Sequence, residues 1–278
     1  AFRADILQPL WHVADSRMLF AGCLGRNAPH SHSTSVLLAG LYDDFALKVG
    51  TTEWVRCRTA VIRAGTSYEF DASGRPLAVV YVEPNAASVD GLARLIGEAW
   101  EIPGAVVGRR GEISLIRALY EDPKSPAWVA AAIEDLVCFM NGGARRKVDE
   151  RIAHTIDLLA ADEARVDEAW TGRHPPVAIA ARRAGLSTSR FQHVFKGEIG
   201  VSYRRYLGWR RMRMAVRDVV AGSNLTMAAH GAGYCDQAHF AHAFAGYSGR
   251  PRPEVLHAHG VERRCLRTDG VLRAQLIF

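Results

Sequence analysis

The chain lacks the sequence features typical of membrane proteins, of secreted proteins and of small domains stabilised by disulfides or zinc. Its 278 residues contain no apolar run long enough to span a bilayer, and the first segment, AFRADILQPLWHVADSR, has no apolar core like that of a signal peptide. The cysteines are scattered without a C-x-x-C pair, which fits neither a disulfide framework nor a zinc ribbon: Cys23, Cys57, Cys138, Cys235 and Cys265. We therefore expect a protein of the reducing cytoplasm.

Catalytic signatures are also missing. The sequence shows no glycine-rich phosphate loop and no pairing of a nucleophile with a histidine and a carboxylate. His30 and His32 are a candidate metal pair at the mouth of a barrel, but Tyr68 stands where a third histidine would be expected. We expect no enzyme and no cofactor. The alternative is a cupin-type metal-dependent enzyme with an appended helical domain.

Positive charge is present and unevenly distributed. The whole chain has a formal net charge of +6 and a pI of about 9.2. Residues 176–257 hold twelve lysines and arginines against four acidic residues, so their net charge is 12 − 4 = +8 and that of the remainder is 6 − 8 = −2. Such a local excess is typical of a surface that binds a nucleic-acid backbone, although a solvated basic face has the same composition.

The first half of the chain consists of short apolar or alternating runs. HSTSVLLAG, YDDFALKVG, TEWVRCRTAVI, TSYEF and PLAVVYVEP are separated by Gly, Pro, Asp and Ser, a pattern that predicts a β-sandwich or barrel. Helical spacing follows in VDGLARLIGEAW and SPAWVAAAIEDLVCFM. NGGARRK, residues 141–147, is the expected linker, and from residue 148 the pattern is helical.

Two segments of the second half repeat one pattern. AARRAGLSTSRFQHVFKGEIG (180–200) and MAAHGAGYCDQAHFAHAFAGYSG (227–249) each contain Ala-x-x-x-Gly, a capping residue, two phenylalanines four positions apart and a final glycine. Three pairs share an offset of 49 residues: Phe191 and Phe240, Phe195 and Phe244, and Gly200 and Gly249. A repeat at one offset within a basic region favours two copies of one structural unit over two unrelated hairpins.

The repeated unit has the physical requirements of a helix-turn-helix. Gly185 or Gly233 takes the left-handed turn at low cost, and Ser187 or Asp236 can cap the second helix. Phenylalanines at i and i+4 hold that helix in the core, which leaves its outward face free for a groove of DNA. The intervening residues 202–222 predict one long helix. Two units on one rigid arm can enter successive major grooves, about 34 Å apart.

At these positions the chain resembles the AraC/XylS family of bacterial transcription regulators, over roughly residues 148–256. The matching residues are Ala181, Gly185, Ser187, Phe191, Phe195, Lys196, Gly200, Tyr206, Arg211, Ala215, Ala229, Gly233, Tyr234, Asp236, Gln237, His239, Phe240, Phe244, Gly249 and Pro251. The resemblance implies an α+β fold, with an N-terminal cupin-like β-barrel and dimerisation helices, and a C-terminal all-α domain of two helix-turn-helix units joined by a long helix.

The resemblance also implies a division of the chain and its partners. Residues 1–141 would bind an effector and dimerise, residues 142–260 would bind DNA, and residues 261–278 form a tail. The expected protein is a homodimeric regulator of the activator type that binds double-stranded promoter DNA and contacts RNA polymerase.

Outward side chains of the two recognition helices are the candidate DNA contacts. On the first helix, expected over about residues 188–197, they are Ser189, Arg190, Gln192, His193 and Lys196. On the second they are Gln237, Ala238 and His242, and the family usually has basic residues where His242 and Ala245 stand. We therefore expect the first unit to supply most sequence specificity. The candidate phosphate contacts are Arg204, Arg205, Arg210, Arg250 and Arg252.

The effector is suggested by one weaker pattern. Arg56, Arg58 and Arg63, followed by Asp71 and Ser73 in DASG, resemble the order in PilZ domains, where an arginine pair precedes Asp-x-Ser-x-x-Gly and binds cyclic di-GMP. A hairpin turn on the barrel surface explains the same residues, and a sugar or another metabolite in the barrel is equally compatible. We include His30 and His32 among the candidate effector-binding residues.

Together these patterns predict a ligand-responsive, sequence-specific DNA-binding transcription regulator. Besides the metal-dependent enzyme, one other alternative stays open. The nearly neutral second recognition helix would also suit an interaction module that kept the helix-turn-helix frame without binding DNA.

Overall fold

The computed structural model describes residues 7, 9–84, 86, 89–122, 124–141, 148–164 and 174–249. The first part of the chain forms nine strands that belong to one antiparallel sheet. Their bounds are β1 Leu10–Val13, β2 Arg17–Arg26, β3 Ser35–Gly40, β4 Phe45–Val49, β5 Val55–Cys57, β6 Thr59–Ile62, β7 Tyr68–Val82, β8 Ile96–Ile102 and β9 Ala105–Gly111.

The sheet is open where a closed barrel was expected. The strand order is β1-β2-β7-β3-β6-β9-β8, with β4 paired to β5 and to β7. Within the described residues no ladder joins β1 to β8, so these two strands stay at the ends of the sheet. The prediction of an antiparallel sheet domain is confirmed, while the cupin-like closure is not part of the observed fold.

The long strand β7 organises the sheet. Its first residues, Tyr68–Asp71, pair with β4, and its last residues pair with β3 on one side and β2 on the other. Ser73 and Gly74, with φ of 52° and 74°, lie inside this strand beside a register shift in β2. The sequence predicted a break at Asp71–Pro76; the strand instead bends there and continues, because its neighbours pair on both sides of the bend.

One helix prediction in this half was wrong. VDGLARLIGEAW has helical spacing, yet only α1, Val89–Ala93, is helical, and Ile96–Ile102 forms the edge strand β8. Pairing with β9 overrides the local preference, because six residues of β9 offer β8 a ladder of backbone partners. The sequence pattern also does not predict β1 and β2. These two strands pair with each other at the end of the sheet nearest the second half of the chain.

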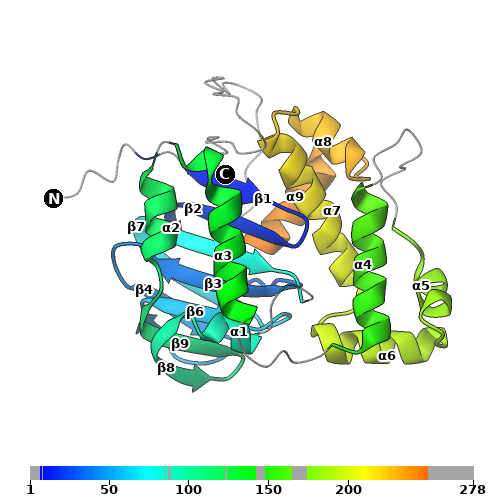
Figure 1. The fold of residues 1–278 in the computed structure, drawn as a ribbon, viewed down its shortest axis with the longest axis horizontal. Helices are drawn as coiled ribbons and strands as arrows, with labels where there is room; N and C mark the ends of the chain where they lie inside the picture. Colours follow the sequence, from blue (N-terminus) through cyan, green and yellow to red (C-terminus); the bar gives the residue numbers. More distant parts are fainter. Residues whose placement is uncertain are drawn as a thin grey trace.

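Helices cover one face of the sheet. They are α2 Ser114–Glu121, the short 3-10 turn Ser125–Ala127 and α3 Val129–Asn141 (Figure 1). Leu119 and Ile133 of these helices bury against sheet residues such as Leu37 and Val80. The opposite face has its own apolar core around Phe45, which is 2% exposed. Side chains therefore fill both faces of the sheet.

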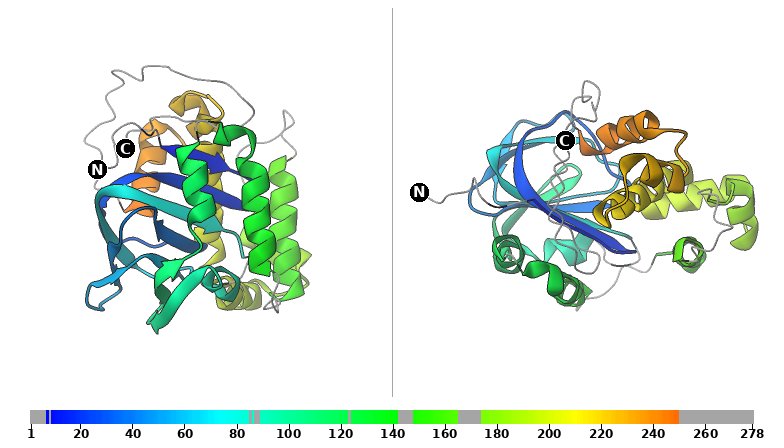
Figure 2. Two further views of the ribbon diagram at one scale, coloured as in Figure 1. Left: turned by 60° about the vertical axis from the view of Figure 1, so that its left-hand side comes forward. Right: turned by 90° about the horizontal axis from the view of Figure 1, so that it is seen from above.

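The second part of the chain is helical, as predicted. The helices are α4 Glu150–Ala164, α5 Val177–Arg183, α6 Thr188–Ile199, α7 Tyr203–Val220, α8 Leu225–Gly231 and α9 Gln237–Ser248. Figures 1 and 2 show this group beside the sheet, with α6 and α8 near opposite ends of α7. The predicted long connecting helix is confirmed. Asn141, the first residue of the expected linker 141–147, is the last residue of α3. The rest of that linker, the boundary at residue 260 and the tail 261–278 lie outside the described residues.

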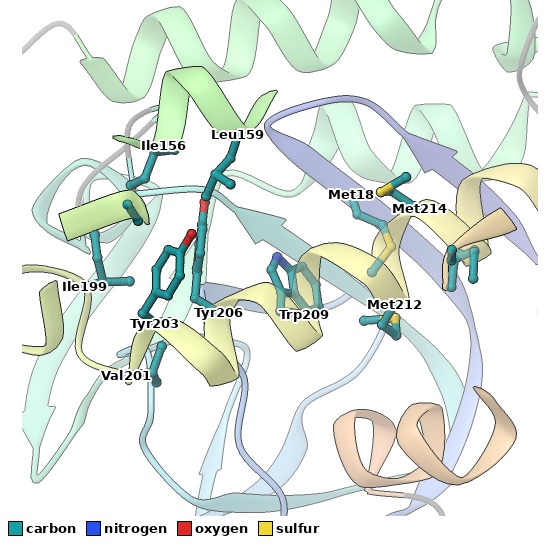
Figure 3. Packing of buried hydrophobic residues seen from close by; sticks show 14 of the residues in the cluster. Met18, Ile156, Leu159, Ile199, Val201, Tyr203, Tyr206, Trp209, Met212 and Met214 are labelled. Carbon is teal, nitrogen blue, oxygen red and sulfur yellow. The ribbon is translucent and has the colours of Figure 1, made fainter. Parts of the chain in front are cut away.

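The apolar core of the helical part extends into the sheet. Trp11 and Met18, from β1 and β2, belong to the same buried cluster as Trp209 and Met214 of α7 (Figure 3). A hydrophobic core that crosses between two parts of a chain holds them together, because separation would expose it to water. The helical half is thus docked on the sheet. Within the described residues, no helix is long and apolar enough to cross a membrane.

We predict that Phe195→Ala destabilises the helical part strongly. The ring is fully buried and packs on Tyr203 and Tyr206 at centroid distances of 5.3 and 5.5 Å. Truncation of such a ring lowers the free energy of unfolding by about 3–5 kcal/mol. Urea unfolding measures the loss. Met227→Ala is the control, because Met227 is 64% exposed; equal losses in the two variants would contradict the assignment of Phe195 to the core.

Candidate nucleic-acid interface

The first repeat forms a helix-turn-helix. Helix α5 is followed by a turn in which Gly185 has φ of 65°, and α6 then begins at Thr188. The Ser187 side chain accepts a hydrogen bond from the backbone N–H of Arg190, which satisfies one of the free donors at the start of α6. Phe191 is fully buried. These contacts fix how α6 emerges from the turn.

The second repeat has the same construction with one more residue in its turn. Helix α8 leads through Gly233, with φ of 77°, to α9. Oδ1 of Asp236 accepts a hydrogen bond of 2.7 Å from the backbone N–H of His239. Phe240 is buried and Phe244 partly buried. Tyr234, which follows Gly233 in this turn, is buried, and the guanidinium of Arg211 lies over its ring at 4.7 Å.

The first recognition helix presents its predicted contact residues to solvent. Five side chains on α6 are exposed: Ser189, Arg190, Gln192, His193 and Lys196. The buried residues of α6 are Phe191, Phe195 and Ile199, and the five exposed side chains project away from them on the outward side of the helix. This face combines hydrogen-bonding groups that can read base edges with cations that can contact phosphates.

The second recognition helix presents a smaller and more neutral face. Ala238 and His242 are exposed, whereas Gln237 is half-buried and accepts a hydrogen bond of 3.4 Å from the Thr226 hydroxyl. Ala245, where the family usually has a basic residue, is also half-buried. Among these residues only His242 can carry a positive charge, so α9 offers few donors to a phosphate or a base.

The candidate phosphate-binding arginines separate into three groups. Arg204 is exposed, and Arg205 is exposed but donates hydrogen bonds to the carbonyl and hydroxyl oxygens of Ser31. Arg210 is only 1% exposed, so its assignment as a phosphate contact is wrong. Its guanidinium instead forms a buried ion pair with Glu163. Arg250 and Arg252 lie outside the described residues.

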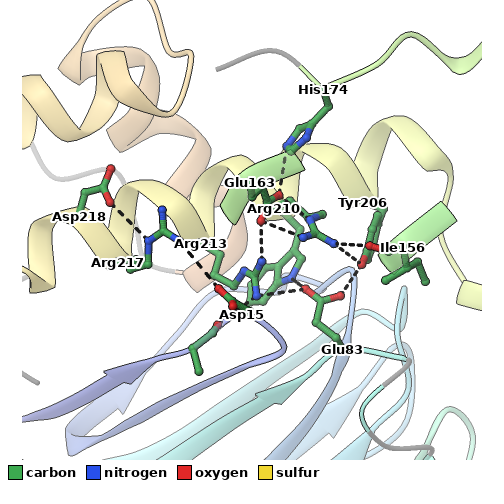
Figure 4. Close-up of polar contacts among 12 residues, drawn as sticks. Asp15, Glu83, Ile156, Glu163, His174, Tyr206, Arg210, Arg213, Arg217 and Asp218 are labelled. Atoms are coloured by element: carbon green, nitrogen blue, oxygen red, sulfur yellow. Dashed lines mark hydrogen bonds and ion pairs between the residues drawn. The ribbon is translucent and has the colours of Figure 1, made fainter. Parts of the chain in front are cut away.

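The buried ion pair is part of a network between α4 and α7 (Figure 4). Arg210 donates to both carboxylate oxygens of Glu163 at 2.6 and 2.8 Å, and Arg213 donates to the same carboxylate at 2.9 Å. Burial opposes ionisation of Glu163, but the hydrogen bonds from Arg210 and the two arginine charges outweigh it and lower the pKa of the carboxyl. The network therefore keeps Glu163 charged in the interior.

A second buried carboxylate connects α7 to the sheet. Glu83 lies just after β7 and is 3% exposed. It accepts hydrogen bonds from the Tyr206 hydroxyl at 2.6 Å and from the Trp209 indole N–H at 3.0 Å. The sequence offered no signal for Glu83 or Glu163, because their partners lie 123 and 47 residues away along the chain.

The candidate histidine pair, His30 and His32, lies between the two halves of the chain. His30 and His32 are 7% and 3% exposed, with ring centroids 4.8 Å apart. His32 also contacts the rings of Tyr81 and Trp209, and its two ring nitrogens have no hydrogen-bond partner among the described residues. The described residues contain no group of three histidine, cysteine or acidic side chains placed to hold a metal ion.

Of the other candidate effector residues, Arg56 of β5 and Asp71 of β7 lie close together, because both pair with Ala46 of β4, whereas Arg63 follows β6. Arg56 is exposed on β5, and Arg63 is exposed at the end of β6. Arg58 donates hydrogen bonds to the carbonyl oxygens of Tyr42 and Leu41. Oδ1 of Asp71 accepts from the N–H and hydroxyl of Ser73, as in a side-chain-supported turn. The structure thus gives Arg58 and Asp71 partners of their own within the sheet.

Comparison with known proteins supports the assignment of the helical part. Residues 180–252 match a family described as a helix-turn-helix domain. None of the curated proteins matches the chain in sequence. The chain carries an AraC-type helix-turn-helix domain, so the resemblance predicted from the sequence is confirmed.

Solved structures share the overall arrangement. An apo variant of ToxT from Vibrio cholerae superimposes with a TM-score of 0.52 at 9% identity, over 84% of this chain and 93% of that one. Wild-type ToxT bound to an unsaturated fatty acid gives 0.51 at 10% identity, over 84% and 92%. ToxT bound to (E)-4-(8-methylnaphthalen-1-yl)but-3-enoic acid gives 0.50 at 9%, over 84% and 95%. These likenesses show a common fold of sheet domain and helical region.

We predict that the buried histidines make stability depend on pH. Burial lowers the pKa of His30 to about 4 and that of His32 well below its usual value. Between pH 6.5 and 4 these histidines are therefore protonated in the unfolded chain but stay neutral in the native chain. The free energy of unfolding consequently falls as the pH falls. The slope is at most about 1.4 kcal/mol per pH unit for each histidine.

Urea unfolding between pH 7.5 and 5 checks this expectation. The matched variant is His32→Phe, which keeps a ring in the aromatic cluster and removes two nitrogens that lack partners among the described residues. We expect a shallower pH dependence and a more stable protein at pH 6. An unchanged slope in this variant would show that His32 does not contribute.

Proposed function

We propose that this protein is a ligand-responsive, sequence-specific DNA-binding transcription regulator. The proposal depends above all on one observation: two helix-turn-helix units of the same construction are joined by one helix, and the first exposes a continuous polar and basic face on α6. Such a helix fits a major groove, where arginine and glutamine side chains read guanine and adenine edges.

The two units contribute unequally in this proposal. Gln192 and Arg190 on α6 read bases, while Lys196 and Arg204 contact phosphates. The second unit, whose exposed face carries Ala238 and His242, mainly contacts the DNA backbone and reads few bases.

We predict that Arg190→Ala and Gln192→Ala each weaken binding to a cognate duplex by about 5- to 100-fold. His242→Ala is expected to change affinity less than about threefold, because a phosphate contact is worth less than a bidentate base contact. Fluorescence anisotropy can measure the affinities, with a duplex that the wild-type protein selects from a randomised pool. The logarithm of the affinity should fall linearly with the logarithm of the salt concentration.

Glu53→Ala is the control, because Glu53 is exposed on the sheet domain, far in sequence from both units. If the wild-type chain selects no duplex, or if binding does not respond to salt, the protein is no DNA-binding regulator. If the two α6 variants bind as tightly as Glu53→Ala, the bases are read by another surface.

A small-molecule effector bound by the sheet domain is the second part of the proposal. The structures of ToxT with an unsaturated fatty acid and with a butenoic acid derivative support it, because that protein has the same fold. For this chain the candidates are cyclic di-GMP, recognised by Arg56, Arg63, Asp71 and Ser73, and a sugar or other metabolite. Ligand binding would then change how the sheet domain holds the helical part.

Calorimetric titration with cyclic di-GMP tests the first candidate. We predict that binding is lost in Arg56→Ala and Asp71→Ala and retained in Glu53→Ala, which removes an exposed charge near the same hairpin. No heat of binding with the wild-type chain would eliminate cyclic di-GMP. Native mass spectrometry of protein purified from its own host would then detect a different co-purified metabolite.

We propose that the protein is a cytoplasmic homodimer that activates transcription through RNA polymerase. Helix α3 supports the dimer, because it covers the sheet with one face and exposes Phe139, 52% accessible, on the other.

A further inference from the structure

The glycines that end the two recognition helices both contact the sheet domain. Gly200 ends α6 and Gly249 ends α9, and both adopt the left-handed conformation, with φ of 87° and 65°. These positions are equivalent in the repeat, 49 residues apart. Two loops of the sheet domain meet them: residues 27–33 and residues 63–66, which we call the docking loops.

The first contact is backbone against backbone. A Cβ atom placed on Gly65 would lie 2.8 Å from the carbonyl oxygen of Gly200 and 3.1 Å from Cγ1 of Val201. A Cβ atom placed on Gly200 would lie 2.9 Å from the carbonyl oxygen of Ala64. No side chain fits at this point, so the end of α6 lies directly on loop 63–66.

The second contact has the same character. The carbonyl oxygen of Gly249 accepts a hydrogen bond from the backbone N–H of Ala28. A Cβ atom on Gly249 would collide with His30 Nδ1 and with the carbonyl oxygen of Ala28. The end of α9 is therefore held by loop 27–33. Close by, the Tyr247 hydroxyl of α9 and the Ser33 hydroxyl both donate to the carbonyl oxygen of Arg205, each at 3.2 Å.

The two docking loops are connected to each other by backbone hydrogen bonds. The backbone N–H of Gly65 donates to the carbonyl oxygen of His32 at 2.8 Å, and His30 pairs with Tyr68 through two backbone hydrogen bonds. A displacement of one loop is thus transmitted to the other. The middle of α7 is held by a third contact, in which Glu83 accepts from Tyr206 and Trp209.

Without the sheet domain, the two units would be connected through α7. That helix has 18 residues and spans about 27 Å, so small bends along it or at the turn after it would change the angle between α6 and α9. Attachment at three separate points removes this freedom. The outward residues of α6 stay exposed in the docked arrangement, so docking orients the reading surface of α6 without covering it.

We infer that the docking loops act as an intramolecular clamp that sets the relative orientation of the two recognition helices. Gly65 and Gly249 are positioning residues in this role, and neither needs to touch DNA. The inference rests on the proposed function, because orientation matters only if both units engage one duplex. An effector would act on this clamp by changing the position of one docking loop relative to α7.

The test uses variants that open the clamp. Gly65→Ala and Gly249→Ala introduce a Cβ atom at the two contacts. Gly50→Ala is the matched control, because Gly50 also has positive φ, 56°, and a Cβ atom there meets nothing within 4 Å. All three variants carry a similar backbone strain, and only the first two disturb docking. Ser33→Ala is a milder opening variant, since it removes one interdomain hydrogen bond and leaves the backbone unchanged.

The first measurement is the distance between the two units, by electron–electron double resonance in the full-length chain. Spin labels are placed on Arg182→Cys in α5 and Met227→Cys in α8, both exposed positions, after Cys23, Cys138, Cys235 and Cys265 have been replaced by serine. We expect a narrow distance distribution for the labelled chain that keeps its native glycines and for the labelled Gly50→Ala variant. The distribution should broaden or shift in Gly65→Ala and Gly249→Ala, and to a smaller extent in Ser33→Ala.

The second measurement is the tolerance of DNA spacing. One base pair is inserted between the two half-sites of the duplex selected by the wild-type protein. We expect this insertion to weaken binding of the wild type and of Gly50→Ala by about tenfold or more, since it displaces one half-site around and along the duplex. In the opening variants the penalty should fall by at least about threefold.

The two measurements separate the inference from the proposed function. If the distance distribution is the same in all variants, or if all suffer the same spacing penalty, the clamp does not exist in the form inferred. If the wild-type chain selects no duplex at all, the proposed function fails, and the distance measurement alone still decides whether the loops hold the two units.

Discussion

The buried carboxylate of Glu83 is the contact on which the arrangement of the molecule depends. It joins the end of β7 to α7 by accepting hydrogen bonds from Tyr206 and Trp209 in a site that water does not reach. A buried carboxylate without such donors would be very unfavourable, so its presence requires α7 to lie against the sheet. Around it, Trp11 and Met18 join the core of the helical part. Polar and apolar contacts therefore favour one docked arrangement.

This docking connects the two functions that we propose for the two parts of the chain. The sheet domain has both faces covered by side chains, so an effector would act there at a surface or by displacing part of the packing. The helical part exposes α6 for DNA. The contacts between them lie at α7 and at the ends of α6 and α9, which is where, in the clamp that we infer, a displaced loop would change the angle between the recognition helices.

The helical half could be predicted in detail because its information is local. Capping by Ser187 and Asp236, the turns at Gly185 and Gly233, and the buried phenylalanines all follow from residues within one or two turns of each other. The sheet was harder, because a strand depends on partners that are distant in sequence. The sequence pattern predicts a helix where the edge strand β8 forms, and a break where β7 bends and continues. Arg210 looked like a surface cation because nothing near it in sequence reveals Glu163.

The sequence by itself determined the repeat, the two helix-turn-helix units and the long helix between them, since periodicity, capping and turn glycines act over a few residues. Only the tertiary structure decided that the sheet stays open, that Glu83 and Glu163 are buried against α7, and that Gly200 and Gly249 rest on loops of the sheet domain. These outcomes depend on which surfaces meet after folding. A residue's neighbours in space, unlike its neighbours in the chain, are set by the packing of the whole molecule.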